Sequence, residues 1–518
     1  MAIVVFSGPG YGQGLGKNKV QYESFDWRYI QSEHFDIYFV KGSERVAEFT
    51  AETAEAALKQ IQKHWNYNLE GRIMIVTYRS HNTFQQTNVT TELPEESLGG
   101  FTEFFKNRVV VPFTGNYEAY RHVVHHELTH AVNLRFFYGT GFQSILIGAS
   151  TSNIPLWFSE GLAEYESRGG WDVEADMFMR DATISGYLPE IGMLGGYFAY
   201  KGGQSVFYYL DRKYGEEKVG EFVNKVRNTR DVDRALRSAV GVDMPEFNRD
   251  WQNWLRRIYW PTVADLKSPE EIGERVTDHK KWRNFVNNGP AISPDGEKIA
   301  FLSDRGGYFD VWMLDVESEK LHRILRGERS GGFEQLKWLD ARISWSPDSK
   351  FLTFASKAGS KDAIHILDVT RRKVVRSFRF DVDGLFNPAY SPDGNKIAFV
   401  GLKDGASDIY YFDLTKDDLV QVTADIFSDD DPAWTGDSQE LVYVSDRQDS
   451  LRVRDYDEVL NIWDLNYRSM DLYQIRPGEA YATRLTTTAT NERTPTFSPD
   501  GKFLVFTADA NGIFNLYR

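Results

Sequence analysis

The sequence predicts two successive domains, an α+β domain in the first half and an all-β domain of repeated strands in the second. Apolar residues recur at helical spacing in several segments before residue 260, whereas a Ser-Pro-Asp-Gly turn between alternating strands recurs after residue 290. The length of 518 residues agrees with this division, because it exceeds what one hydrophobic core usually holds.

Residues 122–130 read His-Val-Val-His-His-Glu-Leu-Thr-His and contain an H-E-x-x-H pattern. We expect a helix here, because residues 117–137 include no Pro or Gly. On a helix, His126 and His130 lie on one face and can share a metal ion, and Glu127 lies close enough to take a proton from a metal-bound water. The alternative is that the two histidines form hydrogen bonds within a core.

A second segment, residues 155–166, reads Pro-Leu-Trp-Phe-Ser-Glu-Gly-Leu-Ala-Glu-Tyr-Glu and supplies further ligand candidates. A catalytic zinc takes three protein ligands, and His2Glu is one standard set, so Glu160 is the natural third ligand. Glu164 lies one helical turn further and can accept the far N–H of His126, which would fix the tautomer of that ring. An amphipathic helix with solvated glutamates is the alternative, although Trp157 and its apolar neighbours favour partnered carboxylates.

Both segments resemble a known family. The strings H-E-L-T-H-A and P-L-W-F-S-E-G-L-A-E-Y resemble the gluzincin metallopeptidases, specifically the peptidase MA-like group. Residues 16–22, 25–27 and 34–38 resemble members in which this zincin-like α+β domain precedes a TolB-like propeller. The insertion at residues 138–153 is rich in Gly, Ser and Thr and is expected to be a loop, which leaves the substrate class open.

The resemblance implies a zinc metallopeptidase that holds one Zn²⁺ ion per chain. By it, His126, His130 and Glu160 would be the metal ligands and Glu127 the catalytic base. Glu164 would not bind the metal itself. Its spacing suggests that it accepts a hydrogen bond from the metal-bound His126.

Peptide hydrolysis also needs a donor for the oxyanion that develops on the attacked carbonyl. Tyr200, just before an expected helix, is the preferred candidate, and Tyr165 and Tyr197 compete with it. His122 and His125 flank the motif, and we expect them beside the site or at the surface rather than among the ligands.

Two apolar runs before the motif, residues 72–77 and 108–113, are expected to be strands, with residues 99–103 turning into another. In gluzincins an edge strand beside the zinc helix pairs with an extended peptide. Pro112 suits such an edge position, because it cannot donate to a ladder. The alternative is an ordinary core strand.

The second half repeats a short turn pattern that begins at Ser293, Ser346, Ser391, Thr435 and Ser498, about 44 to 63 residues apart. Several strands per unit at this period predict the blades of a β-propeller, and the residue pattern of the repeats resembles TolB-type blades. About five blades are present. The sequence ends within the third strand of the fifth, so we expect an incomplete propeller truncated at the C-terminus.

These patterns divide the chain into four segments. We expect a possible signal-peptide remnant at 1–15, the metallopeptidase domain at 16–262, a charged linker at 263–285 and the propeller at 286–518. The charged stretch 447–457 within the fourth repeat is predicted to be a surface loop.

Composition limits the partners and the compartment. A formal net charge of −15 argues against nucleic acid, no apolar run reaches membrane-spanning length, and the absence of Cys excludes disulfides. Residues 2–6, followed by Gly-Pro-Gly-Tyr-Gly-Gln, look like the tail of a signal peptide. We therefore expect an extracytoplasmic location, periplasmic in a bacterium.

The predicted function is hydrolysis of peptide bonds, with the propeller recruiting a substrate or a protein partner. The alternative is a non-catalytic binding or scaffold protein whose zinc site is structural or vestigial, although a structural site would not require Glu127. No G-x-M-E-N-like motif of the aminopeptidase branch is present, which favours an endopeptidase.

Overall fold

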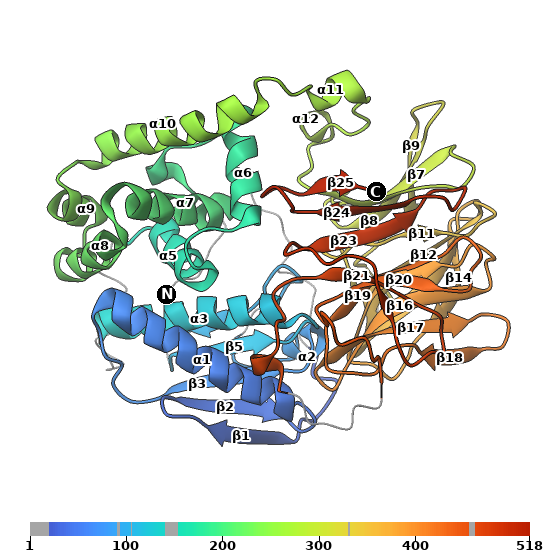
Figure 1. Cartoon of the computed structure of the whole chain (residues 1–518), viewed down its shortest axis with the longest axis horizontal. Helices are drawn as coiled ribbons and strands as arrows, with labels where there is room; N and C mark the ends of the chain where they lie inside the picture. Colours follow the sequence, from blue (N-terminus) through green and yellow to red (C-terminus); the bar gives the residue numbers. More distant parts are fainter. Residues whose placement is uncertain (1–19, 91–93, 105, 140–153, 330–331, 455–460) are drawn as a thin grey trace.

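A computed structural model describes residues 20–90, 94–104, 106–139, 154–329, 332–454 and 461–518. The chain forms two halves that lie side by side, one made of helices around a single sheet and the other of five small sheets arranged as propeller blades (Figure 1). The predicted fold class, a peptidase-like α+β domain followed by a five-bladed propeller, is confirmed. The predicted signal-peptide remnant lies outside the described residues.

The sheet of the first half has five strands in the order β1-β2-β3-β5-β4. The central pairs β2/β3 and β3/β5 are parallel, whereas β1 and β4 pair antiparallel at the two edges. The helices α1 and α3 lie over one side of this sheet (Figure 1). The bounds are β1 Trp27–Gln31, β2 Phe35–Val40, α1 Glu44–Trp65, β3 Ile73–Tyr78, α2 His81–Phe84, β4 Phe101–Glu103 and β5 Arg108–Pro112.

The expected edge position of Pro112 is wrong, because β5 lies between β3 and β4. Pro112 pairs with Tyr78 of β3, whereas β4 begins at Phe101, opposite Val110. Since Phe113 donates its N–H to Tyr78, the alternation of the strand points the proline nitrogen to the other side, at a position that β4 does not reach because it begins opposite Val110. Proline is tolerated there because, among the described residues, no strand pairs with that side of it.

Helices build the rest of this half. The side chain of Asn116 caps α3 by accepting the N–H of Ala119 at 2.8 Å, and Gly139 ends that helix. The helix α7 begins earlier than expected, so Tyr200 lies in its first turn. The bounds are α3 Tyr117–Tyr138, α5 Leu156–Arg168, α6 Val173–Ile184, η1 Ile191–Met193, α7 Tyr197–Tyr214, α8 Glu216–Thr229, α9 Val232–Val240 and α10 Met244–Val263, with the short α11 Pro269–Ile272 and α12 His279–Trp282 leading to the second half.

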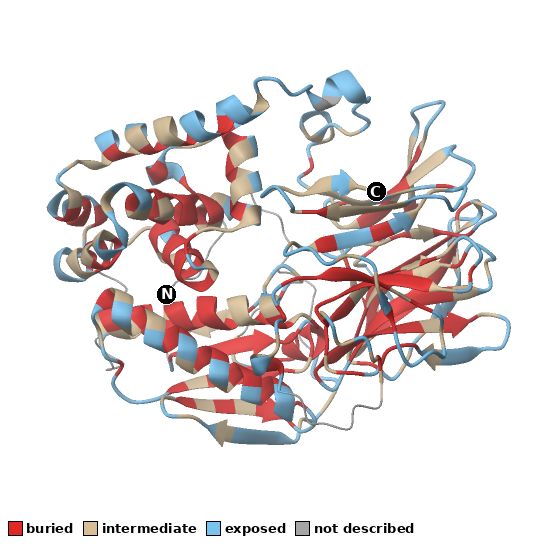
Figure 2. Cartoon of the chain, in the orientation of Figure 1, coloured by how far each residue is buried: buried red, intermediate tan, exposed pale blue. Residues whose placement is uncertain are grey.

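The core of the first half lies between the sheet, α1 and the helix layer (Figure 2). Its largest fully buried side chains include Trp65 and Trp251. Glycines allow α5 and α7 to cross at backbone contact, because a Cβ added to Gly161 would lie 2.5 Å from the Cα of Gly203. This close crossing fixes the position of α5 relative to α7, and α5 carries the predicted ligand Glu160.

Each blade is an antiparallel sheet of short strands joined by the repeated turn. In the first of these turns Ser293 accepts the N–H of Lys298, Asp295 accepts the N–H of Glu297, and Gly296 has a φ of 76°. The turn is therefore a structural element, as its residue types indicate. The strand bounds are β6 Asn287–Ile292, β7 Lys298–Ser303, β8 Asp310–Asp315, β9 Leu321–Leu325, β10 Gln335–Leu336, β11 Ser344–Trp345, β12 Phe351–Ala358, β13 Lys361–Asp368, β14 Lys373–Phe378, β15 Gly384–Tyr390, β16 Lys396–Lys403, β17 Ala406–Asp413, β18 Asp418–Gln421, β19 Asp429–Trp434, β20 Leu441–Ser445, β21 Asp471–Ile475, β22 Thr483–Arg484, β23 Glu492–Phe497, β24 Leu504–Ala508 and β25 Asn515–Tyr517, with the 3-10 turn η2 Ile462–Asp464 between β20 and β21.

The predicted surface loop at 447–457 begins with a buried residue, which corrects that expectation. The side chain of Arg447 has no exposed area and lies 2.7 Å from Asp429 and 3.0 Å from Asp425. Burial of this cation is tolerated because two carboxylates neutralise it and the rings of Tyr443 and Tyr473 pack beside it. Residues 455–460 lie outside the described part of the chain.

The two halves contact each other through specific polar groups. The hydroxyl of Tyr117, at the start of α3, donates to the carbonyl of Gly405 at 2.6 Å, and Ser407 donates to the carbonyl of Gly115 at 2.9 Å. The propeller therefore holds the start of the helix that carries the H-E-x-x-H motif.

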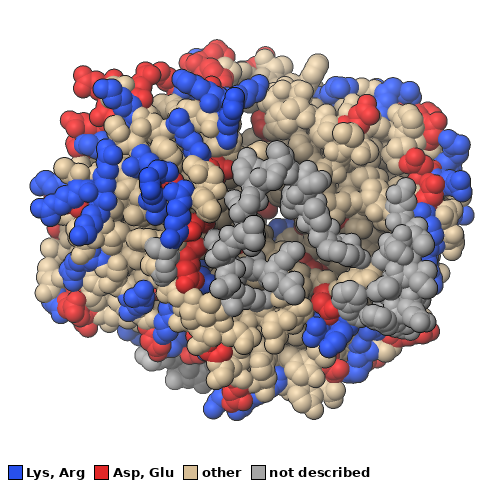
Figure 3. All heavy atoms as spheres, turned by 180° about the vertical axis from the view of Figure 1, so that it is seen from behind, with Lys and Arg blue, Asp and Glu red and all other residues tan. Residues whose placement is uncertain are grey.

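Seen from behind, the surface shows basic and acidic side chains interspersed over both halves (Figure 3). The outer strand β14 exposes Lys373 and Arg376, so the negative net charge does not describe every part of the surface. No described helix combines the length and apolarity needed to cross a bilayer.

Candidate active site

The three predicted metal ligands meet between α3 and α5. The Nε2 atoms of His126 and His130 lie 3.1 Å apart, and Oε2 of Glu160 lies 3.3 Å from the first and 3.1 Å from the second. The two histidines come together because they are one helical turn apart, and α5 brings the carboxylate to the same point. Three donor atoms at such separations match three corners of a tetrahedron around one ion with bonds of about 2.0–2.2 Å.

Burial and charge favour a cation at this point. Burial lowers the pKa of His126, but the carboxylates of Glu160 and Glu164 outweigh it and raise that pKa to about 10. The pKa of Glu160 is in turn lowered against the effect of burial by His130 and His126. The donor set of two imidazoles and one carboxylate is that of catalytic zinc sites, so the residues present fit a zinc ion.

A second row of contacts lies behind the ligands. Oε1 of Glu164 is 3.0 Å from Nδ1 of His126 and 3.4 Å from Nε2 of His122, and its Oε2 is 2.8 Å from Nζ of Lys201. Lys201 is only 4% exposed and also lies 3.5 Å from Asp172. Glu164 therefore occupies the position predicted for it, and His122 and Lys201 are partners that the sequence did not reveal.

The predicted base, Glu127, lies on α3 beside the ligands and is 8% exposed. The hydroxyl of Thr102 in β4 lies 2.9 Å from Oε2 of Glu127 and 2.8 Å from its main-chain oxygen. Sequence reasoning missed Thr102, because nothing in its local pattern distinguishes it from other strand residues.

Of the three candidate tyrosines, Tyr200 contacts the predicted ligands. Its ring stacks on that of His126 with centroids 6.0 Å apart, and burial and then Glu160 raise its pKa. Tyr165 is buried and donates its hydroxyl to Asp211 at 3.1 Å, whereas Tyr197 is 54% exposed at the start of α7. The geometry thus favours Tyr200 over its two competitors.

His125 is a buried residue of α3. It is 3% exposed, and burial lowers its pKa to about 3. Burial also lowers the pKa of His122 to about 3. Neither residue is at the surface, which was one of the two positions expected for them, and His122 lies beside the site through its contact with Glu164.

Comparisons with known proteins separate the two halves in the same way. Residues 53–257, which include α3 and α5, match the family described as the peptidase MA superfamily, and residues 341–457 match the TolB beta propeller domain. The chain combines a peptidase MA superfamily domain with a TolB-type propeller.

The individual relatives match about half of the chain. The Tol-Pal system protein TolB of Francisella tularensis subsp. mediasiatica is 28% identical over 275 residues, which cover 51% of this chain and 55% of that protein. The chain therefore spans about half the length of the curated relatives it matches. Among solved structures, TolB from Acinetobacter baumannii is 20% identical with a TM-score of 0.33, covering 45% of this chain and 54% of that one. The β-propeller domain of the trilobed protease from Pyrococcus furiosus is 18% identical with a TM-score of 0.31, covering 45% and 66%.

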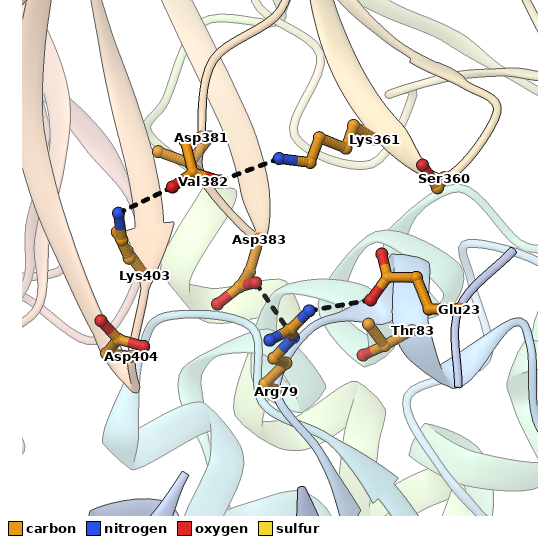
Figure 4. Close-up of a pocket in the computed structure, with 10 residues that line it drawn as sticks. All are labelled: Glu23, Arg79, Thr83, Ser360, Lys361, Asp381, Val382, Asp383, Lys403 and Asp404. Carbon is orange, nitrogen blue, oxygen red and sulfur yellow. Dashed lines mark hydrogen bonds and ion pairs between the residues drawn. The ribbon is translucent and has the colours of Figure 1, made fainter. Parts of the chain in front are cut away.

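A cavity of about 230 Å³ lies away from the ligands, where the peptidase domain meets the propeller (Figure 4). Arg79 of the peptidase domain lies 2.9 Å from Glu23 and 3.0 Å from Asp383, and on the propeller side Lys361 and Lys403 both pair with Asp381. Its cations are thus neutralised by neighbouring carboxylates. This cavity belongs to the contact between the two domains rather than to the candidate metal site.

Proposed function

We propose that this protein is a zinc-dependent peptidase whose metal would be held by His126, His130 and Glu160. The observation that carries the proposal is the convergence of three donor atoms, two from histidines and one from Glu160, within 3.3 Å of one another beside a second acidic residue, Glu127. A zinc ion bound there would polarise the scissile carbonyl and lower the pKa of a bound water.

The surrounding residues would carry the proton transfers. Glu127 would accept a proton from the attacking water and deliver it to the leaving amine. Tyr200 would donate a hydrogen bond to the oxygen of the attacked carbonyl as it becomes negative. Glu164, with Lys201 on its other oxygen, would hold the ring of His126 in one tautomer and one orientation.

The edge strand β4 would bind an extended peptide substrate by adding a strand to the sheet. This assignment supports an endopeptidase, because main-chain pairing along an edge does not require a free terminus. The propeller would recruit the substrate or a protein partner, and we place the protein outside the cytoplasm, in the periplasm of a bacterium. Support for these last two points comes from the likeness to the Tol-Pal system protein TolB.

The test compares the wild type with Glu127→Gln at equal zinc content, using quenched peptides and casein. Glu127 is not among the proposed ligands, so both proteins should bind about one zinc ion, and kcat/KM of the variant should fall by at least about 100-fold because a general base is lost. A wild type that binds zinc but cleaves nothing in a broad peptide library would instead favour a binding or scaffold protein. Failure to bind zinc would overturn the proposal.

A further inference from the structure

The strand that lies along the proposed active site is attached to α3 at two successive turns of that helix. Thr102 of β4 contacts the main-chain oxygen of Glu127 at 2.8 Å, and Asn107, in the turn between β4 and β5, donates to that of Ala131 at 3.1 Å. Both acceptors lie on the side of α3 that faces the strand. The strand and the helix are therefore in fixed register beside Glu127.

β4 and the residue before it, Gly100, contact the Glu127 side chain at two points. The Thr102 hydroxyl is 2.9 Å from Oε2 of Glu127, and a Cβ added to Gly100 would lie 3.1 Å from Cγ of Glu127 and 3.0 Å from Val111. Gly100 is itself buried. The hydroxyl thus contacts the end of the side chain, and the glycine backbone limits the position of its stem.

Strand pairing assigns different roles to the backbone and the side chain of Thr102. Thr102 lies opposite Val109. Phe113 donates its N–H to Tyr78 of β3, so by the alternation of the strand the odd-numbered positions of β5, Val109 included, direct their N–H and C=O groups toward β3. In an antiparallel pair, the residue opposite such a position also turns its N–H and C=O away from its partner. The backbone of Thr102 therefore faces the open edge of the sheet, while its hydroxyl faces Glu127.

We propose that Thr102 is a positioning residue that ties the edge strand, where a substrate would pair, to the carboxylate of Glu127. This inference rests on the proposed function. The hydroxyl restricts the carboxylate to one rotamer. A peptide paired to the backbone of Thr102 therefore lies at a fixed position relative to the carboxylate of Glu127. Val in place of Thr keeps the branched shape and the backbone but removes the hydroxyl, whereas Ser keeps the hydroxyl.

The experiment measures kcat and KM for Thr102→Val and Thr102→Ser at matched zinc content. We expect kcat of Thr102→Val to fall by about 10- to 100-fold, because displacement of a reacting group by about 1 Å has this effect, with KM within about twofold of the wild type. Thr102→Ser should stay within about threefold of the wild-type kcat. The matched control is Thr77→Val, since Thr77 is a buried threonine of the same sheet whose hydroxyl bonds to Tyr38.

A second measurement does not depend on activity or on zinc. Crystal structures of the metal-free proteins should show the Glu127 carboxylate displaced in Thr102→Val and unmoved in Thr102→Ser. An unmoved carboxylate in Thr102→Val, a wild-type kcat for that variant, or an equal loss in Thr77→Val would overturn the inference. A wild type that cleaves no peptide would refute the proposed function, and the crystal structures would still decide whether Thr102 positions Glu127.

Discussion

Nδ1 of His126 lies 3.0 Å from Oε1 of Glu164, while Nε2 of the same ring lies 3.3 Å from Glu160. The imidazole is therefore held between two carboxylates on neighbouring turns of α5. Because the Glu164 carboxylate accepts a hydrogen bond from Nδ1–H and so keeps the proton on that nitrogen, Nε2 keeps its lone pair for a metal ion. Lys201 neutralises the remaining charge of Glu164 at 2.8 Å and makes its burial tolerable.

This relationship predicts the result of replacing Glu164 by Gln. We expect zinc affinity to fall by about 10- to 100-fold, since the amide is a weaker acceptor for the ring N–H and the buried Lys201 loses a charged partner. Affinity is measured by competition with a chelator of known strength. Glu174→Gln is the control, because Glu174 lies 3.9 Å from Lys201 and is 48% exposed. Equal affinities of the wild type and Glu164→Gln would contradict the role of this carboxylate.

The convergence of the proposed ligand residues could be predicted from the sequence because each half of the set is local. His126 and His130 share a helical face by spacing alone, and Glu160 and Glu164 do so in the same way on the next described helix. The predicted family and fold class are confirmed for the same reason, since repeats and motifs are local patterns.

The contacts that complete the site come from distant segments and left no local pattern. Thr102 reaches Glu127 across 25 positions, and Lys201 reaches Glu164 across 37. Arg447 shows the same limit in the propeller. Its charge predicts a position at the surface, whereas its partner Asp429, which allows its burial, is distant in the sequence. Pairing across a fold depends on the tertiary arrangement, which periodicity does not encode.

Tyr200→Phe tests the proposed oxyanion donor. We expect kcat to fall by about 100-fold, which is typical when one donor to a developing oxyanion is removed, with little change in zinc content because Tyr200 is not among the ligands. Steady-state hydrolysis of a quenched peptide gives the result. Tyr165→Phe serves as the control, because Tyr165 uses its hydroxyl on Asp211. If Tyr165→Phe lost kcat and Tyr200→Phe did not, the assignment would pass to Tyr165.

Gly161→Ala tests whether the crossing of α5 and α7 sets the ligand geometry. The added methyl would lie 2.3 Å from the carbonyl carbon of Gly203, so the helices must separate. We expect a loss of stability of about 3 kcal/mol, at the upper end for overpacking because backbone cannot move aside, and weaker zinc binding since α5 carries Glu160. Gly192→Ala is the control, because an added Cβ there meets no atom within 4 Å. Thermal unfolding and chelator competition measure the two effects, and a wild-type melting temperature would refute the argument.

Glu96→Gln tests the contact between the peptidase domain and the propeller through its pH dependence. Oε2 of Glu96 accepts the N–H of Trp338 at 2.9 Å, and burial raises its pKa from 4.5 to about 7 even though Lys337 opposes the shift. Between these two values the folded chain keeps a proton that the unfolded chain releases. Stability from this group is therefore present below about pH 4.5, is lost as the pH rises to about 7, and stays constant above that.

Gln keeps the acceptor oxygen but carries no charge at any pH. The variant should therefore match the wild type near pH 5 and be more stable by about 1–3 kcal/mol near pH 8, where the wild type must hold a buried carboxylate. Urea unfolding midpoints at the two pH values measure the difference, and Glu95→Gln, at an exposed neighbouring position, is the control. Midpoints that differ equally at both pH values, or a variant that loses stability as the pH rises, would show that Glu96 does not enter the interface protonated.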